Sequence, residues 1–151
     1  PNVAKRNGRT ALMFASQYGH TQTVQLLLAA GANVNSRKKN GRTPLMFAAE
    51  SGNHCTVTAL IDAGANVNTQ RKDGWSAIMF ASQMGDGDSV HALIECDAEV
   101  NVVNDDGWSP LSLAGESGYV DVVRLLAQAG ADVHARDDQG WTALTFAAQN
   151  G

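Results

Sequence analysis

Hydrophobic and polar positions along the chain repeat every 33 residues. One apolar column contains Leu12, Leu45, Ile78, Leu111 and Leu144. A column of small residues contains Ala15, Ala48, Ala81, Ala114 and Ala147. One glycine column, at the same spacing, contains Gly8, Gly41, Gly74, Gly107 and Gly140. Self-similarity at a fixed period in this range indicates a row of stacked structural units.

The second unit shows which elements each period encodes. Thr43 is a good helix N-cap and Pro44 suits the first helical position. The short helix that follows ends at Gly52, because glycine takes a positive φ without steric cost. A second helix, with apolar residues at i, i+3 and i+4 spacing, ends in the same way at Gly64. The polar segment 67–74 predicts a loop or the tip of a β-hairpin.

A unit of two short amphipathic helices cannot bury both apolar faces alone, so the units must stack side by side. The expected fold is an all-α repeat, an α-solenoid that forms a single domain over residues 1–151. The expected repeat boundaries are about 6–38, 39–71, 72–104 and 105–137, with residues 1–5 ending a preceding repeat and residues 138–151 forming a partial one. We expect a piece of a longer array, in which the partial repeat exposes apolar surface around Leu144 and Ala148.

The repeated motifs resemble those of a known family. Arg42-Thr43-Pro44-Leu45 and the later Gly64-Ala65-Asn66-Val67-Asn68 are similar to the signature of an ankyrin repeat, and the likeness covers essentially the whole chain. The resemblance implies a curved ankyrin-type solenoid of helix-turn-helix units with β-hairpin fingers at right angles to the helix pairs. It also implies protein binding through the fingers and first helices, and no catalysis.

Two columns depart from that family pattern. Where the family usually has histidine after Thr-Pro-Leu, the chain has Met13, Met46, Met79, Ser112 and Thr145. The hydrogen bonds of that histidine must therefore be absent or replaced. Asp97 stands where the other repeats end a helix with glycine, and aspartate in a left-handed conformation costs on the order of 1 kcal/mol. We predict that the third repeat is the weakest junction.

Charge changes sign along the array. Residues 1–75 contain nine basic and three acidic groups, whereas residues 76–151 contain two basic and twelve acidic ones. The basic candidates for partner binding on the fingers are Arg9, Lys38, Lys39, Arg42, Arg71 and Lys72. Such a band should attract an acidic partner facing repeats 1–3. The alternative is that finger tips are solvated and simply tolerate charge.

Aromatic and apolar residues supply further candidates. Trp75, Trp108 and Trp141 follow the finger glycine in three repeats, and tryptophan is enriched at binding hot spots. We expect Arg42 to make a cation–π contact with Trp75. Tyr18 and Met84 end their first helices and are the apolar candidates there. The alternatives are that each tryptophan packs on a neighbouring finger, and that the helix ends show ordinary surface variation.

Composition and residue spacing exclude several classes of protein. No apolar run approaches the ~20 residues of a membrane-spanning helix. The four histidines have no metal-ligand spacing, so we expect no metal and no cofactor. Cys55 and Cys96 cannot form a disulfide framework, which favours an intracellular, cytoplasmic setting. Cys96 replaces an alanine of the other repeats and is expected to be packed, whereas Cys55 lies in a more exposed column.

The predicted function is a non-catalytic protein–protein interaction module, a scaffold or adaptor that binds a protein partner through its concave finger and first-helix surface. An alternative is a regulatory docking segment of a larger enzyme or channel. Nucleic-acid binding by the basic N-terminal fingers is disfavoured by the net charge of −4. The opposite charges of the two halves also predict salt-dependent head-to-tail self-association.

Overall fold

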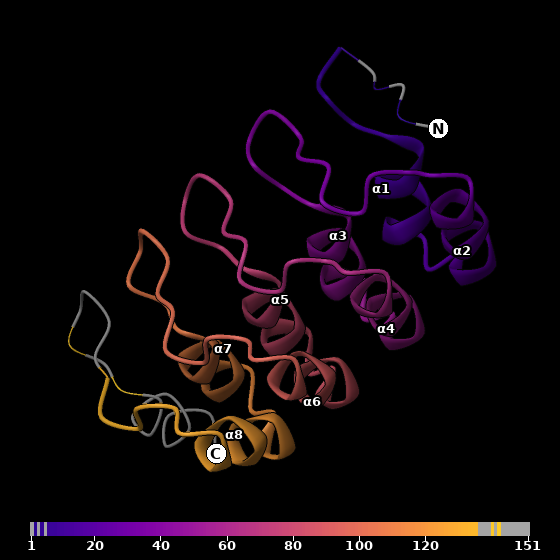
Figure 1. Ribbon diagram of the computed structural model, residues 1–151. Coiled ribbons are helices and arrows are strands. Elements are labelled where there is room, and N and C mark those ends of the chain that lie inside the picture. The colour runs from indigo at the N-terminus through magenta and orange to yellow at the C-terminus, as the bar shows by residue number, and fades with distance from the viewer. Residues whose placement is uncertain (1, 3, 5, 136–139, 141, 143–151) are drawn as a thin grey trace.

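The computed structural model describes the chain except for residues 1, 3, 5, 136–139, 141 and 143–151. The helices of this described part form four pairs: α1 (Ala11–Gln17) and α2 (Thr21–Ala29), α3 (Pro44–Glu50) and α4 (His54–Asp62), α5 (Ala77–Met84) and α6 (Gly87–Glu95), and α7 (Pro110–Glu116) and α8 (Val120–Gln128). The pairs stand in one row, and the loops between them project as fingers on one side (Figure 1). The all-α repeat architecture is therefore confirmed. Leu144, Ala148 and the rest of the partial repeat's expected helix lie outside the described residues.

The first helix of each pair begins where the sequence predicts. The Thr43 hydroxyl accepts a hydrogen bond from the backbone N–H of Met46, and Pro44 occupies the first turn of α3. In α7 the Ser109 hydroxyl accepts from the Ser112 N–H, while the Ser112 hydroxyl accepts from the Ser109 N–H. These caps satisfy amide groups that a helix start otherwise leaves unpaired.

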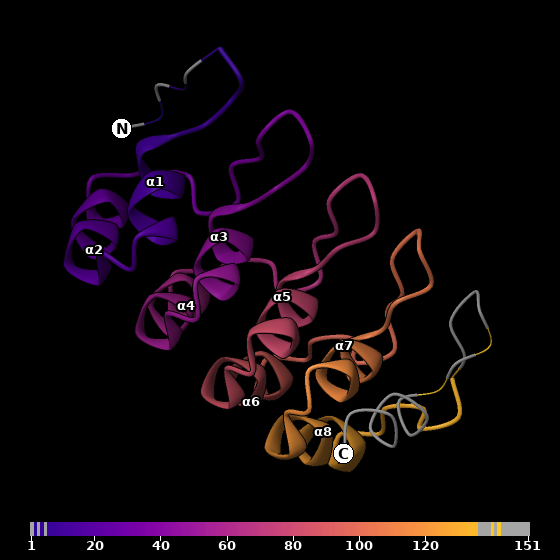
Figure 2. The ribbon, with the colours of Figure 1, turned by 180° about the vertical axis from the view of Figure 1, so that it is seen from behind.

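The core runs along the whole row, both within each helix pair and between successive pairs. The first helices pack on one another in the order α1, α3, α5, α7, and the second helices pack in the order α2, α4, α6, α8. Both rows are visible in Figures 1 and 2. The apolar columns that meet there are almost fully buried: Leu12, Leu45, Ile78 and Leu111 from the first helices, and Val24, Val57, Val90 and Val122 from the second. The apolar surface is thus covered partly by the second helix of the same pair and partly by the neighbouring repeats.

The methionine column replaces polar contacts with packing. Met13, Met46 and Met79 are each no more than 1% exposed, so their flexible side chains fill the space between repeats. In the fourth repeat, the Ser112 hydroxyl instead donates to the Ser109 carbonyl at 3.0 Å. The hydrogen bonds expected of a histidine at this position are therefore absent in three repeats and replaced locally in the fourth.

The fingers are hairpin turns that stop short of forming a sheet. In the third finger the Arg71 N–H donates to the Trp75 carbonyl at 2.8 Å. The isolated antiparallel bridges in the described residues are Ala4–Thr10 and Gln70–Ser76. The expected β-hairpin character is thus limited to single bridges and turns at the finger bases.

Each finger also bonds to the finger before it. The Lys72 N–H donates to the Asn40 carbonyl at 3.0 Å, and the Asp105 N–H donates to the Asp73 carbonyl at 3.1 Å. Gly74 has a φ of +82°, and a Cβ built on it would lie only 2.7 Å from the Asn104 Cα of the next finger. Glycine therefore permits both the turn and the close approach of the two backbones.

Asparagine side chains form a second set of bridges between repeats. The Asn35 amide donates to the Gly64 carbonyl at 3.0 Å, and its oxygen accepts from the Asn66 N–H at 2.8 Å. The same pair of bonds, to residues 29 and 31 positions ahead, is made by Asn2, Asn68 and Asn101. Each of these side chains satisfies one donor and one acceptor at the end of the following helix pair.

Asp97 takes up the left-handed conformation expected of it. Its φ is +60°, and it is the one residue other than glycine with a positive φ in the described part of the chain. Its carbonyl still accepts from the Asn68 side chain at 2.9 Å, so the bridge between repeats is kept. The aspartate thus retains the glycine geometry at a conformational cost.

We predict that Asp97→Gly raises the free energy of unfolding by about 0.5–1 kcal/mol, because it removes the left-handed strain and a negative charge at the C-terminal end of α6. Urea denaturation followed by circular dichroism measures the change. The reverse substitution at the equivalent position, Gly64→Asp, is the matched control and should lower stability by a similar amount. Equal stability of wild type and Asp97→Gly would show that this junction is not weakened.

We predict that Gly74→Ala destabilises the protein by clearly more than Gly64→Ala. Both glycines have nearly the same φ, +82° and +84°, but a Cβ at Gly64 meets no atom within 4 Å. The shared strain is about 1 kcal/mol, and the additional loss at Gly74 reports the contact between fingers. Chemical denaturation of the two variants side by side provides the measurement, and equal losses would argue against close finger stacking.

Candidate functional site

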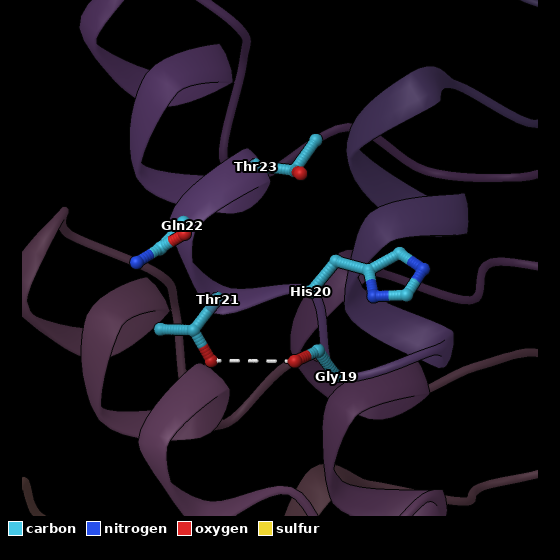
Figure 3. A pocket seen from close by; sticks show the side chains of 5 residues that line it. All are labelled: Gly19, His20, Thr21, Gln22 and Thr23. Atoms are coloured by element: carbon cyan, nitrogen blue, oxygen red, sulfur yellow. Dashed lines mark hydrogen bonds between the residues drawn. The ribbon is translucent and has the colours of Figure 1, made fainter.

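The hollow shown in Figure 3 lies at the turn between α1 and α2 and has a volume of about 360 Å³. It is lined by Gly19, His20, Thr21, Gln22 and Thr23. The Thr21 hydroxyl lies 3.5 Å from the Gly19 carbonyl oxygen and 2.8 Å from the Thr56 hydroxyl, so its polar atom is already engaged. His20 is the one titratable side chain of this lining. The hollow thus offers little chemistry, and the candidate site is the finger surface.

Arg42 is held between the aromatic rings of two repeats. The centre of its guanidinium lies 4.0 Å from the centroid of the Phe47 ring and 4.9 Å from that of Phe80 in the next repeat. It also forms an ion pair with Glu50, and only 12% of its side chain is exposed. Contacts of this kind with aromatic rings stabilise a cation by about 0.5–2 kcal/mol.

Arg9 repeats this arrangement one unit earlier. Its guanidinium lies 3.9 Å from the centroid of the Phe14 ring and 4.8 Å from that of Phe47, and it donates a hydrogen bond to the Gln17 side chain. The cations and rings thus alternate from one repeat to the next. Arg9 and Arg42 are half-buried, and their planar faces are used inside the protein.

In the third repeat a different arginine continues the series. Arg71 lies 5.5 Å from the centroid of the Trp75 ring and 5.4 Å from that of Phe80, while the two rings themselves are 4.7 Å apart. The expected contact between Arg42 and Trp75 was therefore wrong: Arg42 lies on the phenylalanines, and Arg71 takes the place beside the tryptophan. We call Arg9, Arg42, Arg71 and the rings they contact the arginine–aromatic stack.

An acidic side chain fixes Arg71 on the finger. Its Nη2 donates to the Asp73 carboxylate at 2.6 Å, and a second bond runs from Nε. This hydrogen-bonded guanidinium holds the pKa of Asp73 below its usual value. Since a lowered pKa favours the folded state above the unfolded pKa of about 3.9, this contribution is lost as the pH falls through the folded value.

The remaining candidates lie in different surroundings. Lys39 and Lys72 are exposed and Lys38 is half-buried. Trp75 and Trp108 are half-buried on successive fingers, and Trp141 lies outside the described residues.

Tyr18 is 64% exposed and Met84 46% exposed. Tyr18 shares a hollow of about 460 Å³ with apolar residues of α1 and α2 and stacks on His20 with their ring centroids 6.0 Å apart. It therefore lies at the end of the row, between the helices of the first pair.

The phenylalanines of the stack are functional candidates that the charge and tryptophan columns did not indicate. Phe14, Phe47 and Phe80 recur every 33 residues, and Leu113 interrupts the column in the fourth repeat. Phe47 and Phe80 are each 3% exposed. The repeated phenylalanine column could have indicated the stack, because it runs beside the arginine column at the same spacing and arginine commonly lies over an aromatic face.

The two cysteines lie on the row of second helices. Cys55 is exposed in a groove between α2 and α4, with its Sγ 3.5 Å from the His54 Nε2. Cys96 is also exposed, so the expectation that it is packed was wrong. It occupies the cap position at the end of its helix, where Ala30 and Ala63 are exposed as well.

Comparison with protein families gives a match to "Ankyrin repeats (3 copies)" over residues 1–71 and 78–151. The chain belongs to the ankyrin-repeat family. Ankyrin repeats are generally protein–protein interaction modules and are typically non-catalytic. Among curated proteins the comparison found no match to this chain.

Two further observations concern the described part of this ankyrin-repeat chain. None of its helices combines the length and the apolar character that crossing a membrane requires. It also contains no group of three or more histidine, cysteine, aspartate or glutamate side chains placed to hold a metal ion. The finger side of the ankyrin repeats, with its half-buried arginines and exposed lysines, therefore remains the candidate functional surface.

We predict that Arg42→Ala lowers the free energy of unfolding by about 1–2 kcal/mol, because it removes two ring contacts and leaves Glu50 without its partner. Arg42→Lys should recover only part of this loss, since an ammonium cannot lie flat between two rings. The exposed Lys39→Ala is the control and should change stability by less than about 0.5 kcal/mol. Equal free energies of unfolding for all three variants would contradict a stabilising role of the arginine–aromatic stack.

Proposed function

We propose that the chain is a non-catalytic scaffold or adaptor module that recruits a protein partner through its fingers and first helices. The observation that carries this proposal is that the arginines and the lysines of the fingers lie in different surroundings. Arg42 and Arg71 are engaged inside the protein, whereas Lys39 and Lys72 are exposed on the tips. Exposed charge that serves no described internal contact supports a role in attracting a partner with an acidic segment.

The arginines then have a supporting part in binding. They hold the bases of the fingers against the first helices, so that the lysines project from a fixed frame. Pre-organised side chains lose less freedom on binding than flexible ones do. Arg9, Arg42 and Arg71 are therefore proposed to contribute through position, while Lys38, Lys39 and Lys72 face the partner.

Aromatic residues are proposed to complete the surface. Trp75 contacts Phe80 and Arg71, and it remains only partly buried. A half-buried tryptophan offers a rigid apolar anchor to a partner. Trp75 and Trp108 would form this apolar edge beside the lysines, and Tyr18 and Met84 would add to it at the ends of their helices. Trp141 stays a candidate from the sequence alone.

The setting that fits this proposal is intracellular and cytoplasmic. Cys55 and Cys96 are both free and exposed, and such thiols persist best in a reducing compartment. A free module of this kind and a docking segment of a larger enzyme or channel would use the same finger surface.

We predict that wild-type protein immobilised on a support retains a protein from a cell lysate that the Lys39→Glu variant does not retain. The substitution reverses an exposed charge in the middle of the basic band, and rim charges of this kind govern the rate and salt dependence of association. Mass spectrometry of the bound fractions gives the comparison.

The matched control is Arg124→Glu, which makes the same charge change on exposed α8, away from the fingers. If both variants lose binding equally, or if neither does, the proposal that the partner binds at the finger surface is contradicted. Light scattering at low and high salt accompanies the pull-down, because salt-dependent head-to-tail self-association would use the same lysines. A mass that stays monomeric at every salt concentration excludes self-association.

A further inference from the structure

Four consecutive fingers present one charged side chain at the same position. These equivalent residues are Arg6, Lys39, Lys72 and Asp105, each 33 positions from the next. All four are exposed, and none has an ion pair among the described residues. Three positive charges and then a negative one therefore form a line along the tips, which we call the fingertip row.

Asp73, the acidic residue next to Lys72 in the sequence, does not pair with the cations of the fingertip row. Asp73 follows Lys72 directly in the sequence, but its carboxylate accepts two bonds from Arg71. Asp73 is thus paired with Arg71, and Lys72 has no ion pair among the described residues.

Backbone contacts set the spacing of the fingertip row. Every finger is a hairpin of two chain segments, and the Lys72 and Asp105 amides bond directly to the carbonyls of the preceding finger. The helix pairs that carry these fingers pack in one row with axes about 8–10 Å apart, so the fingers repeat at ~10 Å as well. Successive charges of the row are therefore ~10 Å apart.

One extended peptide conformation has the same period. A polyproline II helix has three residues per turn and a rise of about 3.1 Å per residue, so every third side chain points the same way at intervals of ~9.3 Å. A β-strand does not fit, because its residues i and i+3 point to opposite faces. The fingers thus match a polyproline II segment that lies across them.

We infer that the fingertip row binds a polyproline II segment of a protein partner with acidic residues at positions i, i+3 and i+6 and a basic residue at i+9. This rests on the proposed function and adds the spacing and the charge order of the partner. The acidic residues lie over Arg6, Lys39 and Lys72, and the basic residue lies over Asp105. Since charges are screened over about 8 Å at physiological salt, each tip acts mainly on the residue directly above it.

Fluorescence anisotropy with labelled proline-rich peptides tests this inference on the whole chain. The first peptide carries the inferred pattern of three glutamates and one lysine. The second has the same composition with the three glutamates adjacent, and the third replaces the lysine of the first by glutamate. We expect the first peptide to bind about tenfold more tightly than the second, because only its charges can meet all three cations together.

The third peptide separates charge order from net charge. It is the most negative of the three, so unspecific attraction to the basic fingers predicts that it binds most tightly. The inferred order predicts instead that it binds more weakly than the first, because a glutamate then lies over Asp105. In the Asp105→Lys variant the ranking of these two peptides should reverse, while thermal unfolding of this exposed-site variant stays unchanged.

A ranking by net charge, equal binding of the first two peptides, or no binding of any peptide at low salt would overturn the inferred segment. These outcomes are distinct from failure of the proposed function. If the lysate protein is still lost specifically in the Lys39→Glu variant, the finger surface stands and only the spacing is refuted. If the peptides follow the expected order but no lysate protein is retained, the fingertip row and its spacing stand and the proposed recruitment of a lysate protein is refuted.

Discussion

Contact between neighbouring repeats is the constraint on which this protein depends. Its helices have only seven to nine residues, and isolated helices shorter than about 12–15 residues are marginal in water. Their apolar faces are buried against the partner helix and against the helices of neighbouring pairs, and Met46 and Val57 are fully buried in this way. Asparagine bridges and amide bonds between fingers add polar contacts at the same spacing. Stability and surface geometry consequently come from the same repeated contacts.

The arginine–aromatic stack links this constraint to the surface. A guanidinium can lie flat against two rings and still donate to a carboxylate, which an ammonium cannot do. The chain has arginine at the half-buried positions 9 and 42 and lysine at the exposed tips 39 and 72. Arg9 and Arg42 thus make the ring contacts that suit a guanidinium, while Lys39 and Lys72 leave their charges exposed at the tips.

The fold was predictable from the sequence because period, caps and glycines all report local backbone geometry. The 33-residue spacing indicated the row of helix pairs, and Thr43 with Pro44 marked a true helix start. The site was less predictable, since charge alone does not tell which cation points inward. Arg42 and Lys39 are three residues apart, and only the position of the Phe47 and Phe80 rings assigns them to different roles.

Both the arginine–aromatic stack and the charge of the fingertips change between the third and fourth repeats. Phe80 is the last ring of the stack in the described residues, and Leu113 takes its place in the next repeat. At the same junction the fingertip row changes from Lys72 to Asp105, and Asp97 adopts its strained turn. The aromatic column, the charge at the fingertip and the residue at the helix end therefore all change at one junction of the array. The repeats on its two sides keep the same backbone contacts, since the Asp105 amide still bonds to the Asp73 carbonyl.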